Sequence, residues 1–423
     1  MRNSVQLQNV VLGAVAVACL ACASKPVSSA ARSYERSLKA VQRVEHLDLT
    51  AREPAVIEHP DGTLFVAGYF NESIPTLYRS NDRGVIWERL SMGKDAEGAG
   101  NSDVDLAMAA DGTLYYISMV YDRQKDEGTQ ISIGASDNRG ETWRWKTVSR
   151  TRGDDRPWID VAPDGTAHAI WNDGQGVSHV VSTDRGQTWS EPRRIHSEGG
   201  SSHLAVGPHG EVAVRITPFS KSGFVFNPAI DLIAVSEDRG DTWRKSPAPS
   251  QLKWVNWEEV DKDPNSIERW VEPLAWDTAG NLYHLWTDTS GVHLARSADR
   301  GRTWRSSRIV TTGPRPHYPY LTARGNGELA ATWYTGTDSD LRAHIAQITV
   351  RDDSSLVVMS EPFLVDAWKR QQPGDTTRHR DTAGEYFQVV FLKSGELGAA
   401  TAVQDIPAKR TGFTWWKFTS RAK

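Results

Sequence analysis

The chain has 423 residues but only two cysteines, Cys19 and Cys22. The sequence after them therefore offers no disulfide, no thiolate nucleophile and no cysteine metal site. Its charges nearly cancel, with 49 basic and 53 acidic residues. That balance excludes the broad basic field with which proteins bind nucleic acid. We therefore expect stability to come from packing and expect no nucleic-acid partner.

The sequence also lacks an apolar run long enough to cross a bilayer, which takes about 20 residues. The shorter run at residues 10–22 follows Arg2 and is typical of a signal-peptide core. Residues 21–23 (ACA) form a small-residue cleavage site, whereas Cys22 also ends a Leu-Ala-Cys sequence that resembles a lipoprotein box. Both interpretations stay open. We expect a signal over residues 1–23 and an exported protein that is periplasmic, lipid-anchored at the cell envelope, or secreted.

One eight-residue pattern recurs five times, with serine first, Asp-Arg-Gly or Asn-Arg-Gly inside, and tryptophan last. The copies are residues 80–87 (SNDRGVIW), 136–143 (SDNRGETW), 182–189 (STDRGQTW), 236–243 (SEDRGDTW) and 297–304 (SADRGRTW). The Asp or Asn oxygen accepts backbone N–H groups in a tight turn, glycine supplies a positive φ, and tryptophan packs the hairpin. The pattern resembles the Asp-box, or BNR, repeat. One carboxylate per turn is too few for a metal site.

A second repeat precedes each box and consists of a strand, a turn that ends in glycine, and a second strand. The turns lie at residues 61–62, 111–112, 164–165, 209–210, 279–280, 326–327 and 394–395. Turn and box together predict units of four strands, and such units repeated radially form an all-β propeller. We predict seven blades, with six as the alternative because sialidase-type Asp-box propellers have six.

The predicted propeller is a single domain over residues 44–423, preceded by a polar linker over residues 24–43. The last two units lack a readable box, and the seventh lacks its fourth strand. Residues 44–49 are expected to supply that strand from the N-terminal side and to close the ring.

In a propeller the first strands begin at one face, and function is expected in the residues at those entries. Arginines recur in five of the seven entries, and the guanidinium fork binds carboxylates in bidentate fashion. Arg52, Arg156 and Arg315 are therefore candidates for an anion site. The competing interpretation pairs each arginine with a neighbouring acid. Trp158 and Trp270 are candidates for stacking on a sugar.

The entries also resemble those of sialidases. Residues 51–56 (AREPAV) are similar to the sialidase motif F/Y-R-I-P-A-L, whose arginine binds the sugar carboxylate and matches Arg52. Residues 386–398 (YFQVVFLKSGELG) are similar to the segment with the nucleophilic tyrosine, which Tyr386 matches, and Glu272 opens a Glu-Pro dipeptide like that of the activating glutamate. The resemblance implies a retaining glycoside hydrolase for sialic-acid-type sugars, with Tyr386 activated by Glu272.

Departures from the sialidase pattern keep other functions open. The isoleucine of the first motif is Glu53, the loop that should carry the acid aspartate offers only Glu72, and the second family arginine has no match. A non-catalytic propeller that binds a glycan or a protein is one alternative. A polysaccharide lyase or another glycosidase that uses Tyr318 and His317 is the other.

Calcium is the one cofactor that the sequence suggests, and it does so weakly. Asp261, Asp263 and Asn265 follow the spacing of an EF-hand loop, but Ser266 replaces the required glycine and no helices flank the loop. No other cofactor or metal is expected. The expected partner is an extracytoplasmic glycan or glycoconjugate, with membrane contact only through a lipid anchor, and the protein is expected to be a monomer.

Overall fold

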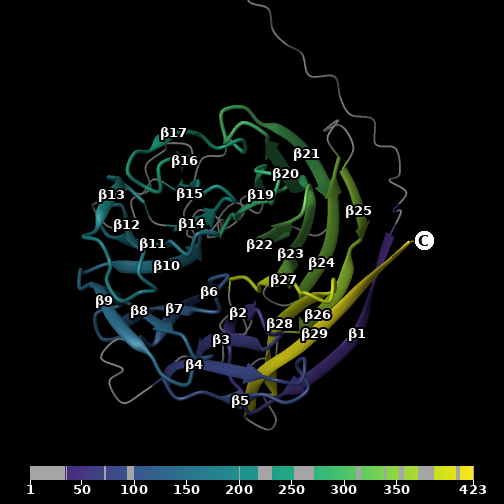
Figure 1. Ribbon diagram of the computed structural model, residues 1–423. Coiled ribbons are helices and arrows are strands. Elements are labelled where there is room, and N and C mark those ends of the chain that lie inside the picture. The colour runs from purple at the N-terminus through teal and green to yellow at the C-terminus, as the bar shows by residue number, and fades with distance from the viewer. Residues whose placement is uncertain are drawn as a thin grey trace, which may run out of the picture. The chain divides into compact units, whose positions relative to one another are not determined.

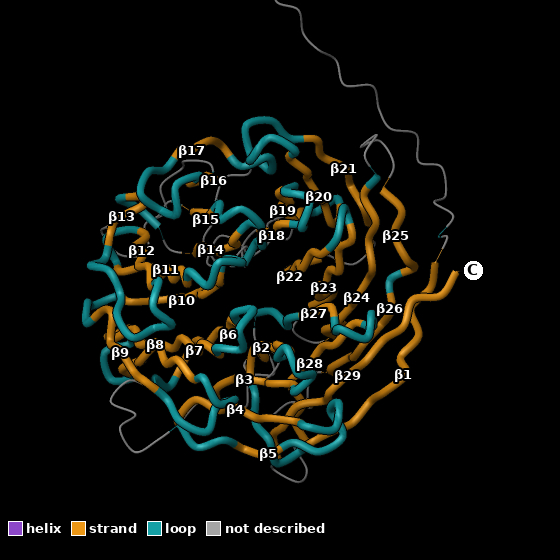
Figure 2. The backbone as a smooth tube through the Cα atoms, in the orientation of Figure 1, coloured by secondary structure: helices purple, strands orange, loops and turns teal. Residues whose placement is uncertain are grey.

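The computed structural model describes residues 34, 36–70, 73–92, 100–199, 201–217, 231–251, 271–310, 316–337, 340–351, 357–369, 385–405 and 410–422. The chain divides into two units, Met1–Ser33 and Tyr34–Lys423, and all described residues belong to the second. The regular elements in these ranges are strands joined by loops and turns (Figure 2). Over the same ranges no helix has the length and apolarity needed to cross a membrane.

Five antiparallel sheets of four consecutive strands follow one another around a ring (Figure 1). The first blade comprises β2 (Arg52–Glu58), β3 (Leu64–Phe70), β4 (Ser73–Ser80) and β5 (Glu88–Arg89). The second comprises β6 (Ser102–Met108), β7 (Leu114–Asp122), β8 (Glu127–Ser136) and β9 (Arg144–Ser149). The third comprises β10 (Asp154–Val161), β11 (Ala167–Asp173), β12 (Val177–Ser182) and β13 (Arg193–His196). The fourth comprises β14 (Ser201–Val206), β15 (Val212–Thr217), β16 (Leu232–Ser236) and β17 (Arg244–Pro247). The fifth comprises β18 (Leu274–Trp276), β19 (Leu282–Asp288), β20 (Gly291–Ser297) and β21 (Arg305–Val310).

The remainder of the ring is one sheet of nine strands. Its strands are β22 (Pro316–Arg324), β23 (Glu328–Thr337), β24 (Asp340–Val350), β25 (Val357–Glu361), β26 (Phe363–Lys369), β27 (Val389–Phe391), β28 (Leu397–Asp405), β29 (Arg410–Ala422) and β1 (Arg36–His46). They are ordered β22-β23-β24-β25-β1-β29-β28-β27, and β26 also pairs with β24.

The all-β propeller of four-stranded blades is confirmed, but the predicted number of seven blades, or six, is wrong. Five four-stranded blades are separate, and the strands expected to form two more belong to the nine-stranded sheet. The cause is a short parallel pairing of β1 with β25, in which Arg36 lies opposite Ser360 and Ser37 opposite Glu361.

A strand from the N-terminal side does pair with the last strand, but it comprises Arg36–His46 and not residues 44–49 as predicted. Strand β1 pairs antiparallel with β29, from Arg36 opposite Ala422 to His46 opposite Phe413. Residues 36–43, which were expected to be part of the linker, therefore belong to the sheet.

The Asp-boxes form the turns between third and fourth strands, as predicted. In the first box the Ser80 hydroxyl donates to Asp82 Oδ1 at 2.8 Å and accepts the N–H of Gly84 at 2.9 Å. The N–H of Ile86 donates to Asp82 Oδ1 at 2.9 Å, and Trp87 Nε1 donates to the Gly84 carbonyl at 3.2 Å. These bonds satisfy backbone groups that a turn would otherwise leave without partners.

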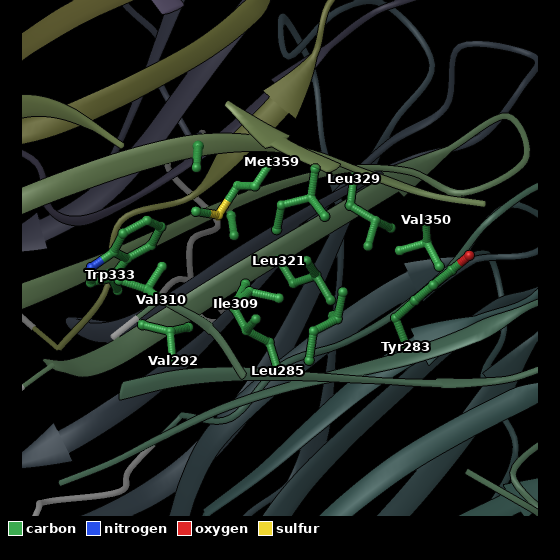
Figure 3. Close-up of a cluster of buried hydrophobic side chains, with 14 of the residues drawn as sticks. Tyr283, Leu285, Val292, Ile309, Val310, Leu321, Leu329, Trp333, Val350 and Met359 are labelled. Atoms are coloured by element: carbon green, nitrogen blue, oxygen red, sulfur yellow. The ribbon is translucent and has the colours of Figure 1, made fainter. Parts of the chain in front are cut away.

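The hydrophobic core lies between neighbouring sheets. Figure 3 shows one cluster, in which Tyr283, Leu285 and Val292 of the fifth blade pack against Leu321 and Trp333 of the nine-stranded sheet. Since both faces of a blade are covered in this way, the apolar residues of the strands are removed from water, and this burial is the main source of stability.

Candidate functional site

Four first strands share an irregularity near their beginning. The pairing register shifts at the start of β2, β6, β10 and β22, as expected for β-bulges. At each bulge one residue that is not glycine has a positive φ, and it lies nine residues before the glycine of its hairpin turn. These residues are Glu53 (49°), Asp103 (24°), Arg156 (49°) and Tyr318 (50°). Backbone strain of this kind concentrates at functional sites, because it aims side chains where regular strands cannot.

Three of the four bulge residues line one cavity of about 320 Å³, which we call the entry cavity. It lies where β2, β6 and β10 begin. Its lining comprises Arg52, Glu53, Tyr69, Asn101, Ser102, Asp103, Met119, Tyr121, Arg123, Asp155, Arg156 and Glu385. Three arginines thus share the cavity with four carboxyl groups, and the entry cavity is suited to a polar ligand.

A tyrosine joins an arginine to a carboxyl group on one wall of the entry cavity. Arg52 Nη1 donates to the Tyr69 hydroxyl at 2.7 Å, and this hydroxyl donates to Glu53 Oε2, also at 2.7 Å. Arg52 Nη2 lies 3.4 Å from Glu53 Oε1. Burial raises the pKa of Glu53 to about 7, although Arg52 opposes the shift, and burial raises the pKa of Tyr69 well above its usual value. Glu53 therefore exchanges its proton near neutral pH.

The second arginine of the entry cavity is also paired. Arg156 Nη1 and Nη2 donate to the two carboxylate oxygens of Glu385 at 2.6 and 3.3 Å. Arg156 Nε lies 3.6 Å from Asp155, whose side chain is almost half exposed. The N–H of Glu385 donates to Glu53 Oε1 at 3.0 Å and so connects the two groups. The structure therefore combines both sequence interpretations, since Arg52 and Arg156 converge on one cavity and each has an acidic neighbour.

The predicted pair of Tyr386 and Glu272 is not formed. Tyr386 is 4% exposed, and its ring packs against Trp158 and Tyr320 with centroids 5.4 and 6.1 Å apart. Glu272 is 1% exposed and accepts a hydrogen bond from Arg215 Nη2 at 3.2 Å. Among the described residues no hydrogen bond links Tyr386 with Glu272. Tyr386 is not among the residues that line the entry cavity, so the structure does not place it beside the other candidate residues, and its role as nucleophile stays a prediction.

Other predicted residues are core residues or lie outside the described ranges. Trp158 is 4% exposed, packs on His203 at 4.7 Å and does not line the entry cavity, so its expected stacking on a sugar stays a prediction. Tyr318 is buried and packs edge-on against His317 at 4.9 Å, and neither residue lines the entry cavity. Outside the described residues lie Glu72, Trp270, Arg315 and the suggested calcium ligands Asp261, Asp263 and Asn265.

The sequence interpretation missed Tyr69. It stands on β3 directly opposite Arg52, in a pairing that the bulge at Glu53 sets. Glu53 itself was seen only as a departure from the sialidase motif, whereas here it accepts the hydrogen bond of Tyr69. The hairpin register could not have found Tyr69, because the bulge moves the partner of Arg52 by one residue.

Comparison with known families agrees with this fold and with the repeat. Residues 180–191 match the family model of the BNR/Asp-box repeat. The chain is a β-propeller that carries the BNR/Asp-box repeat. Comparison with curated proteins finds no match.

Solved structures similar to this Asp-box propeller include three carbohydrate-active enzymes. A xyloglucanase from Xanthomonas campestris has 16% identity and a TM-score of 0.51, over 89% of this chain and 55% of its own. An ulvan lyase has 11% identity and a TM-score of 0.50, over 90% of this chain and 94% of its own. A Hadza microbial sialidase has 16% identity and a TM-score of 0.45, over 68% of this chain and 63% of its own. At such identities the likeness to the xyloglucanase and the ulvan lyase supports the fold alone.

Proposed function

We propose that this Asp-box propeller is a sialidase-like glycoside hydrolase that acts on an acidic sugar in the entry cavity. The observation that carries the proposal is the hydrogen-bonded series from Arg52 through Tyr69 to Glu53 on the cavity wall. The series contains a tyrosine and a carboxyl group that can activate it, the two groups that the sequence resemblance assigned to Tyr386 and Glu272. The proposed substrate is an extracytoplasmic glycan, in keeping with the expected signal sequence.

The proposed nucleophile is Tyr69. A phenol is a poor nucleophile until a base takes its proton, and Glu53 Oε2 accepts the hydrogen bond of the Tyr69 hydroxyl and is placed to take that proton. Arg52 donates to the same oxygen and would stabilise the negative charge that develops on it. A tyrosine that is neutral before reaction also avoids repulsion with an anionic substrate. Attack on the anomeric carbon would form a glycosyl-tyrosine, which water then hydrolyses with retention.

The proposed site for the sugar carboxylate is Arg156. Its guanidinium fork now holds Glu385, and a substrate carboxylate would take the place of this side chain in the same bidentate geometry. Asp103 and Asp155 also line the entry cavity. They are the carboxyl groups proposed to protonate the leaving oxygen of the glycosidic bond.

A second candidate is a propeller that binds a glycan without cleaving it. The observation in its favour is that Arg52 and Arg156 already have acidic neighbours and that Tyr69 is only 4% exposed. A site whose two arginines already lie beside acids can bind a polar ligand without carrying out a reaction.

One assay series separates these functions. The purified protein is given fluorogenic sialosides and uronides, and release of the fluorophore is followed together with ligand binding by calorimetry. The hydrolase predicts release with retained anomeric configuration. Binding without release supports the non-catalytic propeller, and an unsaturated uronide product supports a lyase. No release and no binding would refute the proposed site.

A further inference from the structure

The arginines of the Asp-boxes connect neighbouring blades at the ends of the first strands that lie away from the entry cavity. In four boxes the arginine, which is the fourth residue, pairs with an acid in the hairpin turn of the preceding blade. The pairs are Arg139–Asp61 at 3.3 Å, Arg185–Asp111 at 2.9 Å, Arg239–Asp164 at 2.7 Å and Arg300–Glu211 at 3.1 Å. The box arginine therefore forms the same kind of ion pair between neighbouring blades in these four places.

The first Asp-box lacks this ion pair. Its arginine, Arg83, is exposed, and the described residues give it neither an ion pair nor a hydrogen bond. The neighbouring turn is that of strands β27 and β28, in which Ser394 stands at the position that Asp61 has in the first blade. Glu396, at the position of Glu211, lies 3.5 Å from Lys417 Nζ and accepts the Ser394 hydroxyl at 2.9 Å. At this seam Ser394 replaces the turn aspartate, and Glu396 lies beside Lys417 and, in the described part of the chain, forms no ion pair with Arg83.

The place of the missing carboxylate is a cavity of about 580 Å³, which we call the seam cavity. Its lining includes four cations, Arg83, Arg139, Lys393 and Lys417, against the two acids Glu58 and Asp61. Asp61 is engaged by Arg139, and Glu58 accepts the N–H of Lys393 at 2.6 Å. Lys417 lies beside Glu396, whereas Arg83 is a cation that the described residues leave without an acidic partner, and its guanidinium favours an anionic group.

The same box also departs from the repeat in the two residues before its tryptophan. The other four boxes have a polar residue and then threonine there, whereas the first box has Val85 and Ile86. These side chains are 51% and 70% exposed, and they are among the few exposed large apolar side chains of the described residues. The hydrogen bonds to Asp82 come from the backbone N–H groups of Val85 and Ile86. The turn therefore does not require apolar side chains at these two positions.

We propose that the seam cavity is a docking site for a peptide segment of a partner protein. A carboxylate side chain of that segment would bind Arg83 and replace the turn acid, and apolar side chains next to it would cover Val85 and Ile86. A peptide suits both features, since the carboxylates that meet the other box arginines are aspartate and glutamate side chains on turns. A polyuronide would satisfy the arginine but leave the apolar pair exposed. This site is separate from the entry cavity and does not depend on the function proposed there.

The test measures fluorescence anisotropy of labelled octapeptides with the full chain. The probe has glutamates followed by leucines, and two matched peptides replace the glutamates by glutamine or the leucines by serine. We expect the probe to bind, and both matched peptides to bind at least tenfold more weakly. Hexagalacturonate is the saccharide competitor, and it is expected to compete at least tenfold less well than the unlabelled probe.

Two variants of the chain locate the interaction. Arg83→Gln removes the guanidinium, and Ser394→Asp supplies the missing turn acid from within, so each is expected to weaken binding of the probe at least tenfold. Arg185→Gln is the matched control, because Arg185 is already paired with Asp111. Circular dichroism verifies folding, and Ser394→Asp is expected to unfold at the same or a higher temperature than the wild type.

The proposal is overturned if the wild type does not bind the probe at millimolar concentration, or if Arg83→Gln and Arg185→Gln bind it equally well. Equal competition by hexagalacturonate would overturn it in favour of a saccharide site. Tyr69→Phe is expected to leave probe binding unchanged, so a failure at the entry cavity and a failure at the seam cavity give different results.

Discussion

The hydroxyl of Tyr69 donates a hydrogen bond to Glu53 Oε2 at 2.7 Å. The two residues come from adjacent strands of the first blade, and Glu53 reaches the tyrosine because its backbone adopts a positive φ of 49° in the bulge of β2. This pair places a base, the Glu53 carboxylate, next to the proposed nucleophile of the entry cavity.

The acidic limb of the pH profile is expected to rise toward about 7, because Glu53 must be ionised to take the proton of Tyr69 and burial raises the pKa of Glu53 to about 7. At higher pH hydrolysis is expected to fall again, as the carboxyl group that protonates the leaving oxygen ionises. The pH dependence of kcat/KM measures this. In Glu53→Gln the remaining activity should lack the rise near pH 7. A profile for Glu53→Gln with the same inflection as the wild type would assign the titration to another group.

Glu53 is also expected to affect stability in a defined direction. Its pKa is higher in the folded chain than the usual unfolded value of about 4.3, so the folded state holds the proton more tightly. The contribution of Glu53 to stability is therefore full below that unfolded value and is lost as the pH rises through about 7. The unfolding temperature of Glu53→Gln relative to the wild type should increase from about pH 5 to about pH 8. A difference that does not change with pH would contradict the raised pKa.

Arg156→Lys is expected to raise KM for acidic sugars by about 10- to 100-fold and to change kcat much less. Lysine keeps the charge but cannot form the two parallel hydrogen bonds that Arg156 now makes with Glu385. Steady-state kinetics with a sialoside and a neutral glycoside measure the effect. An equal rise of KM for both substrates would show that Arg156 positions the cavity and does not bind the carboxylate.

Glu272→Ala is expected to lower stability by about 3 kcal/mol, since it removes one of the acids beside the buried guanidinium of Arg215. The effect is placed at the low end of the range for broken buried ion pairs because Arg215 keeps Asp231 at 2.6 Å. Chemical denaturation gives the free energy of unfolding. The kcat per folded molecule should remain that of the wild type, and a large loss of kcat would restore Glu272 to the catalytic site.

The repeats made most of the fold predictable from the sequence. Each Asp-box contains the serine, acid and glycine that its turn requires, so the turn and the two strands that flank it follow from eight residues. The number of blades did not follow, because the pairing of Arg36 with Ser360 joins strands more than 300 residues apart. No local pattern encodes such a pairing.

The candidate site was predictable only in part, because the pairing register of β2 with β3 is irregular. Counting back from Glu58 opposite Leu64 would place Arg52 opposite residue 70, but the bulge at Glu53 moves the partner to Tyr69. A shift of one residue exchanges the two faces of a strand. Arg52 and Arg156 were found because the entries of the first strands are conspicuous in the sequence, whereas Tyr69 depends on a backbone conformation that the sequence does not reveal.

The role of Tyr69 as nucleophile is tested most directly by comparing kcat of Tyr69→Phe and Tyr386→Phe on a fluorogenic sialoside. Circular dichroism verifies that both variants fold. Both substitutions remove one hydroxyl from a buried ring, so they are matched in size. We predict that Tyr69→Phe lowers kcat by at least about 100-fold and that Tyr386→Phe stays within a few-fold of the wild type. Retained activity in Tyr69→Phe together with loss in Tyr386→Phe would contradict the account and return the nucleophile to Tyr386.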